Sequence, residues 1–205
     1  MAPGILARYA PIVNLWIWIA DGVSDKRFCN GLTIPLYDFN IICSRIMKLL
    51  FENLASLCGF LLLCLSVSAI GGAVTHTSVN NWYQALEKPS FTPPDWIFSP
   101  VWITLYLLMG LSAWLVWRRT DRKSRRSPFA VFGAQLALNL AWSFIFFGAR
   151  SIGWALIEIG FLWIAIAFNI FLFWRIDRLA GWLLVPYILW VTFAAVLNNS
   201  IYTLN

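Results

Sequence analysis

The sequence predicts an all-α membrane protein whose core is a bundle of five transmembrane helices. Of the 205 residues, 60% are hydrophobic and only 12% are charged, which is too few charged side chains to cover the surface of a soluble domain. Five apolar stretches reach the length of roughly 20 residues that a helix needs to cross a bilayer. These stretches are residues 53–74, 97–117, 128–149, 151–174 and 179–203.

The connections between the stretches indicate one bundle with a defined orientation. Between Arg118 and Arg126 six basic side chains stand against Asp121 alone, which is typical of a cytoplasmic loop. With loop 118–127 in the cytoplasm, the N-terminus of the first helix is also inside, whereas loop 75–96 and the C-terminus lie outside. We therefore expect a multi-pass integral membrane protein that binds no nucleic acid, since the basic block reflects topology.

Residues 1–46 fit this pattern less well. The apolar run from Tyr9 to Ala20 is too short to span a bilayer and ends at Asp21. It would lie in the membrane interface, or Met47 would be the true start of a membrane domain at residues 47–205. The sequence favours the Met47 start or a dispensable leader.

Few residues are suited to metal binding or to covalent attachment of a cofactor. His76 is the one histidine, and the four cysteines are scattered, with Cys58 and Cys64 six residues apart on the first helix. This inventory predicts no metal site, no disulfide framework and no covalent cofactor.

The third apolar stretch has two faces of different kind. Small residues form a ridge that would let another helix approach closely, and they are Gly133, Ala137 and Ala141. The opposite side carries Gln135, Asn139, Trp142 and Phe146, whose amides are costly in hydrocarbon and should face the bundle interior. The ridge is then free for a second subunit of a homodimer, although packing within its own bundle is the alternative.

Glu158 is the one acidic residue within the fourth stretch, on a face shared with Trp154 and Phe161. An acid inside a membrane span is a candidate functional residue. A neighbouring indole or a water-accessible mouth would equally satisfy it as a structural group.

Aromatic side chains recur with helical spacing on the second and fifth stretches, and a further group surrounds three prolines in the outer loop 75–96. The prolines favour an ordered loop, so it could form a lid over an aromatic cavity suited to a flat, apolar ligand. The alternatives are ordinary helix contacts and an aromatic girdle at the interface.

Several motifs in this order resemble the TspO/MBR family of tryptophan-rich membrane proteins. They include Trp82-Tyr83 with Leu86-Glu87-Lys88-Pro89, then Pro93-Pro94 with Trp96, Pro100-Val101-Trp102, Gln135-Leu136 with Asn139 and Trp142-Ser143, Phe146-Phe147-Gly148, and Val185-Pro186-Tyr187 with Leu189-Trp190. The resemblance covers about Met47 to Asn205. It implies a five-helix bundle, usually dimeric, with a cavity beneath the first outer loop.

The resemblance also implies a ligand and a set of site residues. Members of the family accept porphyrins, so protoporphyrin IX or haem is the expected ligand. Carried over by motif, the ligand-binding residues are Trp82, Tyr83, Pro93, Trp102, Tyr106, Asn139, Trp142, Phe146, Trp190, Ala194 and Leu197. The family's sterol-recognition pattern needs a basic residue after its tyrosine, and none follows Tyr202.

Three functions follow as hypotheses. The first is a porphyrin-binding sensor or regulator in tetrapyrrole or stress responses. The second is a light-dependent porphyrin-degrading enzyme in which Trp102 and Trp190 are catalytic, as the resemblance implies for some bacterial relatives. The third is a transporter of porphyrins or other amphipathic solutes, against which the single intramembrane acid and the lack of a visible repeat stand.

Overall fold

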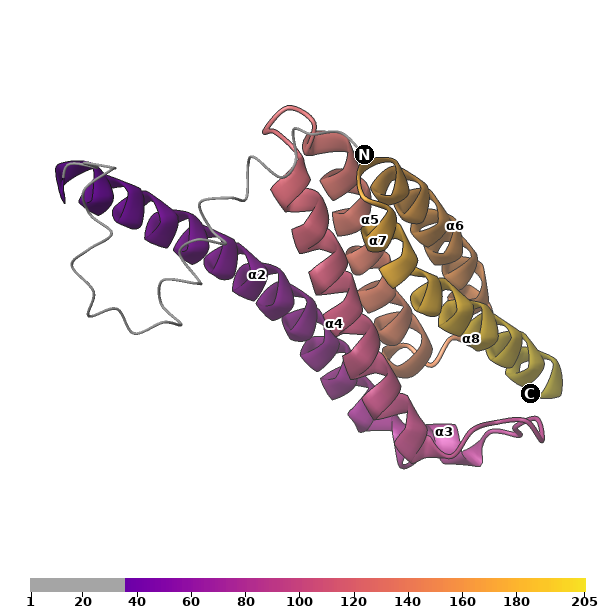
Figure 1. Ribbon diagram of the computed structural model, residues 1–205. Helices are drawn as coiled ribbons and strands as arrows, with labels where there is room; N and C mark the ends of the chain where they lie inside the picture. The colour runs from indigo at the N-terminus through magenta and orange to yellow at the C-terminus, as the bar shows by residue number, and fades with distance from the viewer. Residues whose placement is uncertain (1–35) are drawn as a thin grey trace. The chain divides into compact units, whose positions relative to one another are not determined.

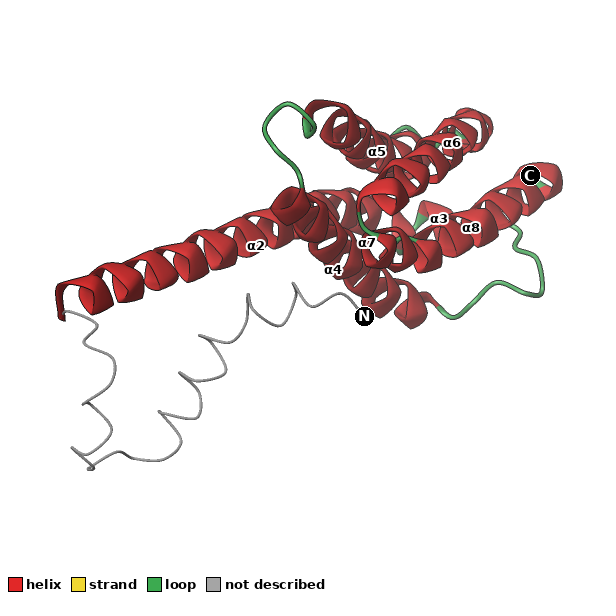
Figure 2. Cartoon of the chain, turned by 45° about the horizontal axis from the view of Figure 1, so that its top comes forward, coloured by secondary structure: helices red, strands yellow, loops and turns green. Residues whose placement is uncertain are grey.

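The computed structural model describes residues 36–205, with side chains described for residues 44, 45, 47, 48 and 50–205. Every regular element in this part of the chain is helical (Figures 1 and 2). The elements are α2 (Leu36–Val79), α3 (Trp82–Ala85), α4 (Asp95–Arg119), α5 (Arg126–Ser143), the π-helical segment η1 (Phe144–Gly148), α6 (Ile152–Ile176), α7 (Arg178–Leu183) and α8 (Val185–Leu204).

Five segments of the described chain are long and apolar enough to cross a membrane. Two of them combine consecutive elements, namely α5 with η1 and α7 with α8. Within the described residues the five segments are Leu50–Val79, Asp95–Arg119, Arg126–Gly148, Ile152–Ile176 and Arg178–Leu204. Each contains or closely overlaps one predicted stretch, so the predicted all-α fold with five spans is confirmed. The fourth and fifth spans are joined by Asp177 alone, between the end of α6 and the start of α7. Asp177 caps α7, because its carboxylate accepts a hydrogen bond from the backbone amide of Leu179 at 2.8 Å.

Some boundaries differ from the predicted ones. Helix α2 continues to Val79, so the lid is confined to residues 80–94, of which one helical turn belongs to α3. At its other end α2 begins at Leu36, inside the predicted leader, whereas the apolar run Tyr9–Ala20 lies outside the described residues. The chain divides into two units between Lys48 and Leu49, and all five spans lie in the second.

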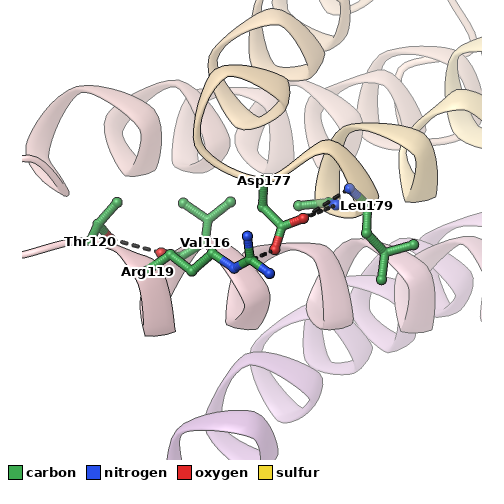
Figure 3. Close-up of polar contacts among 6 residues, drawn as sticks. Val116, Arg119, Thr120, Asp177 and Leu179 are labelled. Atoms are coloured by element: carbon green, nitrogen blue, oxygen red, sulfur yellow. Dashed lines mark hydrogen bonds and ion pairs between the residues drawn. The ribbon is translucent and has the colours of Figure 1, made fainter. Parts of the chain in front are cut away.

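Two contacts define the opposite ends of the bundle in this second unit. At one end Arg119 Nε of α4 lies 2.9 Å from Asp177 Oδ2, which joins the α4–α5 side to the start of α7 (Figure 3). At the other end Asn205 hydrogen-bonds the backbone of Glu87 in the lid. The expected antiparallel order therefore places the basic loop and the lid at opposite ends.

The bundle is closed below the lid by a close approach of α2 to α4. A Cβ atom at Gly110 would lie 3.2 Å from both the Cα of Leu61 and the carbonyl oxygen of Phe60. Glycine is required here because the α2 backbone occupies the space of a side chain. Above this crossing the two helices leave room for a cavity.

Candidate ligand cavity

A cavity of about 580 Å³ lies beneath the lid, which is within the usual range for a small-molecule site of roughly 300–1,000 Å³. Its walls come from α2, α4, α5 with η1, and α8, and two lid residues, Asn80 and Tyr83, also line it. Nine of the eleven residues predicted to bind the ligand line this cavity, namely Tyr83, Trp102, Tyr106, Asn139, Trp142, Phe146, Trp190, Ala194 and Leu197.

The deep end of the cavity is held by hydrogen bonds between three helices. The hydroxyl of Tyr106 donates to Asn139 Oδ1 at 3.0 Å, and Asn139 Nδ2 donates to the hydroxyl of Tyr187 at 2.6 Å. Below them Asn169 Nδ2 donates to Gln135 Oε1 at 2.7 Å. The amides on the third span thus face the interior, as the cost of burying them in hydrocarbon requires.

The π-helical segment shapes one wall. Its wide turn brings the adjacent Phe146 and Phe147 into the cavity together, a local change often found at functional sites. The ring of Phe146 stacks on Trp142 with centroids 4.9 Å apart. Ser78 on α2 donates to the carbonyl oxygen of Phe147 at 2.8 Å, so a backbone acceptor near the end of the segment is satisfied.

Trp102 and Trp190 face the same cavity from α4 and α8. The indole of Trp102 packs against Tyr106, whereas that of Trp190 contacts Phe98 and Phe193 at centroid distances of 5.8 and 5.5 Å. The indole nitrogen of Trp190 is buried and has no hydrogen-bond partner among the described residues. Ring contacts with Phe98 and Phe193 orient this side chain.

Trp82 and Pro93 were predicted to bind the ligand but are not among the cavity-lining residues. Trp82 contacts the ring of Phe146 edge-on at 5.6 Å and supports the wall without lining the cavity. Pro93 is partly buried in the lid and is likewise outside the lining.

Sequence reasoning missed the contribution of the first span. One face of α2 lines the cavity with small and polar residues, which include Ser68, Ala69, Gly72, Thr75 and His76. Their spacing of three and four residues was the available signal, since such residues interrupt an otherwise apolar helix. Asp95 and Asn198 are also in the lining, and neither was predicted.

The side chain of Tyr83 extends from α3 in the lid into the lining of the cavity. This side chain is only 5% exposed, packs against Phe146 and Phe147, and lies under the ammonium group of Lys88 at 4.4 Å. Burial, and secondarily the negative charge of Asp95, raises the pKa of Tyr83 to about 12. The phenol is therefore neutral at physiological pH and acts as a donor or a flat apolar surface.

The remaining candidate residues lie away from the cavity. Glu158 is 8% exposed on the buried face of α6, and its carboxylate has no hydrogen-bond partner in the described part of the chain. Trp154 and Phe161, predicted to share its face, are instead 67% and 61% exposed. At 100° per residue, Trp154 and Phe161 both lie about 40–60° to the same side of Glu158. They therefore stand at the edge of this face, where the helix turns away from the bundle, while Glu158 is buried.

The small-residue ridge of α5 faces outward. Gly133 and Ala137 are exposed and Ala141 is partly buried, while a Cβ atom at Gly133 would meet no atom within 4 Å. The bundle itself does not fill the ridge at Gly133.

These features define a multi-pass helical membrane protein with an aromatic cavity under a lid of prolines and aromatic residues. A model of the TspO/MBR family matches residues 60–204. The chain belongs to the TspO/MBR family.

The sequence of this chain matches those of individual relatives over most of the relatives' length. The chain is 38% identical to the translocator protein of Homo sapiens over 135 residues, which is 65% of this chain and 80% of the human protein. It is 42% identical to the tryptophan-rich protein TspO of Chlorobaculum tepidum over 144 residues, 70% of this chain and 91% of the relative. It is 36% identical to the tryptophan-rich sensory protein of Cereibacter sphaeroides over 126 residues, 62% of this chain and 78% of the relative.

Proposed function

We propose that the protein binds a porphyrin, such as protoporphyrin IX or haem, in the cavity beneath the lid and acts as a sensor or regulator in tetrapyrrole or stress responses. The observation that carries this proposal is the placement of Trp102 and Trp190 on two walls of one cavity of about 580 Å³. Two large aromatic surfaces in one enclosure suit a flat, apolar ligand that binds by stacking and burial.

The distribution of polar groups agrees with a ligand of this kind. At the deep end the amide of Asn139 is already engaged by Tyr106 and Tyr187, so it demands no polar partner from a ligand. At the rim the imidazole of His76 is exposed and able to donate to a polar substituent, whereas the carboxylate of Asp95 would repel an anionic one. A porphyrin would then bury its apolar ring and leave its carboxylates at the rim. The name of the Cereibacter sphaeroides relative, a sensory protein, supports a signalling role.

The test is a titration with protoporphyrin IX in the dark of the full chain in lipid nanodiscs. Indole fluorescence is measured at each addition. We expect saturable quenching, weakened at least tenfold in affinity when Trp102→Phe and Trp190→Phe are combined, because two stacking surfaces shrink. The matched control combines Trp154→Phe and Trp182→Phe, which removes the same number of indoles at positions 67% and 58% exposed. Equal affinities of the two double variants would refute the site.

Light-dependent porphyrin degradation is the second candidate function, favoured by the same pair of indoles. Excited porphyrin and molecular oxygen would supply the oxidising power, and Trp102 or Trp190 would be the residues next to the macrocycle. Illumination of the aerated complex should then yield a new absorbing product whose formation rate falls in Trp102→Phe. A rate equal to that of protein-free porphyrin would exclude this activity.

We also propose the orientation and assembly of the chain. The excess of arginine between Arg118 and Arg126 favours a cytoplasmic position for that end, which leaves the lid and Asn205 outside. The outward ridge at Gly133, Ala137 and Ala141 suits a homodimer, since small residues allow close helix approach in a bilayer.

A further inference from the structure

Within the described residues, the side chain of Asn205 makes the hydrogen bonds that join the lid to α8, and the ring of Phe91 in the lid adds an edge contact to Phe193 of α8 at 6.3 Å. The backbone N–H of Glu87 donates to Asn205 Oδ1 at 3.0 Å, and Asn205 Nδ2 donates to the carbonyl oxygen of Glu87 at 3.0 Å. The amide thus pairs with both backbone groups of one lid residue. Its orientation is fixed chemically, because the oxygen faces a donor and the nitrogen faces an acceptor.

Asn205 continues the cavity-facing side of α8. Ala194, Asn198 and Ile201 line the cavity from this helix, and Asn205 follows Ile201 by one helical turn. A further hydrogen bond of 2.9 Å from Asn205 Nδ2 to the carbonyl oxygen of Ile201 holds the amide over the helix end. The face that forms the cavity wall therefore also reaches the lid.

The opposite side of the lid is held differently. Gln84 Nε2 donates to Asp95 Oδ2 at 2.7 Å, and Lys88 Nζ donates to Gln84 Oε1 at 3.0 Å, which ties the lid to the start of α4. Among the described residues, the hydrogen bonds between the lid and α8 are the two that Glu87 makes with Asn205. In Figure 1 the segment between α3 and α4 passes near the C-terminal end of α8.

We propose that Asn205 is a latch: a positioning residue whose paired hydrogen bonds to Glu87 set how often the lid opens, and thereby how fast a ligand enters and leaves the cavity. The lid matters to the cavity because it carries Tyr83, a lining residue. Both latch bonds are exposed to water, so each adds only modestly to the closed state and breaks reversibly. The statement about ligand exchange rests on the proposed porphyrin site, whereas the statement about lid opening does not.

Lid opening is tested without any ligand, by hydrogen exchange of the full chain in nanodiscs. The amide of Glu87 should exchange about tenfold faster in Asn205→Ala than in the wild type, because loss of both bonds exposes it. The matched control is Asn199→Ala, which removes an exposed amide from the same helix outside the cavity lining. Equal protection of Glu87 in all three proteins would overturn the latch.

Ligand exchange is tested by stopped-flow mixing with protoporphyrin IX in the dark. A latch that holds the lid closed in both the free and the bound protein should slow entry and exit alike. Asn205→Ala is therefore expected to raise the association and dissociation rates by a similar factor of about ten, with Kd changed less than twofold. Asn205→Gln, which keeps both amide groups, should restore part of the slow exchange.

The two experiments separate the possible failures. Faster exchange of the Glu87 amide with unchanged porphyrin rates would overturn the role in ligand passage. A rise in Kd without faster association would show a purely structural effect and also overturn it. If the wild type binds no porphyrin, the proposed function fails, and a second readout replaces the porphyrin rates. It is the rate at which a charged thiol reagent labels Ala194→Cys in a background whose four native cysteines are replaced by alanine. That rate should rise about tenfold when Asn205→Ala is added, and an unchanged rate would refute the latch.

Discussion

The side-chain amide of Asn139 donates a hydrogen bond of 2.6 Å to the hydroxyl of Tyr187. The same amide accepts a hydrogen bond from Tyr106, so one residue of α5 joins α4 to α8 below the cavity. Asn139 is 4% exposed and Tyr187 is fully buried, so both bonds are shielded from bulk water. The floor of the cavity is therefore a polar cluster that is satisfied within the bundle.

Replacing this amide should destabilise the bundle. Asn139→Leu leaves two buried tyrosine hydroxyls without their present partner, and we expect a loss of roughly 1–3 kcal/mol in the free energy of unfolding. Thermal or denaturant unfolding in detergent measures it against Asn199→Leu, an exposed position on α8. Similar stability of the two variants would show that the cluster contributes little.

The crossing of α2 and α4 should be intolerant of side chains. Gly110→Val places atoms against the backbone of Leu61 and Phe60 and should cost roughly 1–3 kcal/mol by forcing the helices apart. Gly59→Val is the matched control, since a Cβ atom there meets nothing within 4 Å. Detergent unfolding of both variants gives the comparison, and equal stabilities would contradict the close approach.

Stability at alkaline pH should depend on Tyr83. Its pKa of about 12 in the folded protein lies above the ordinary value of 10, so the folded state holds the proton more tightly. The resulting stabilisation is fully present below pH 10 and is lost as the pH rises toward 12.

The measurement is the free energy of unfolding between pH 9 and 12. Tyr83→Phe should lack the part of the decline that Tyr83 causes, about 2 kcal/mol for a shift of this size. Tyr202→Phe, at a position 54% exposed, should decline as the wild type does. Parallel declines of wild type and Tyr83→Phe would mean that the lid is open at these pH values.

The ridge on α5 provides a test of assembly that leaves the fold intact. Gly133→Leu adds a side chain into open space, so the monomer should keep its stability while a homodimer formed at the ridge loses its close contact. Sedimentation in detergent should show a shift to monomer. Gly59→Leu is the control, since its side chain also enters open space but on α2, and it should leave the association unchanged. If Gly133→Leu also leaves the association unchanged, the dimer does not use the ridge.

Hydrophobic length and helical periodicity carried most of the prediction. Five runs of about 20 apolar residues admit only helices in a bilayer, because each backbone polar group must be paired within its own segment. The periodic aromatic residues of the second, third and fifth spans are brought to one cavity, as Trp102, Trp142 and Trp190 show. The family motifs covered these same positions.

What the periodicity could not supply was the depth and direction of individual groups. Trp82 precedes Tyr83 directly, yet only Tyr83 lines the cavity, because a short helix turns adjacent side chains to different sides. Glu158 lies on the buried face of α6 although its helical neighbours Trp154 and Phe161 are exposed. Such differences depend on which helix packs against each face.

The sequence by itself determined the fold class, the number of spans and the aromatic character of the site, because these follow from local hydrophobicity and spacing. Only the tertiary structure decided that α2 supplies a polar wall, that Gly110 lets α2 close the floor, and that Asn205 meets Glu87 in the lid. Asn205 and Glu87 are 118 residues apart in the chain. Contacts over such separations arise from helix packing, which no local pattern encodes.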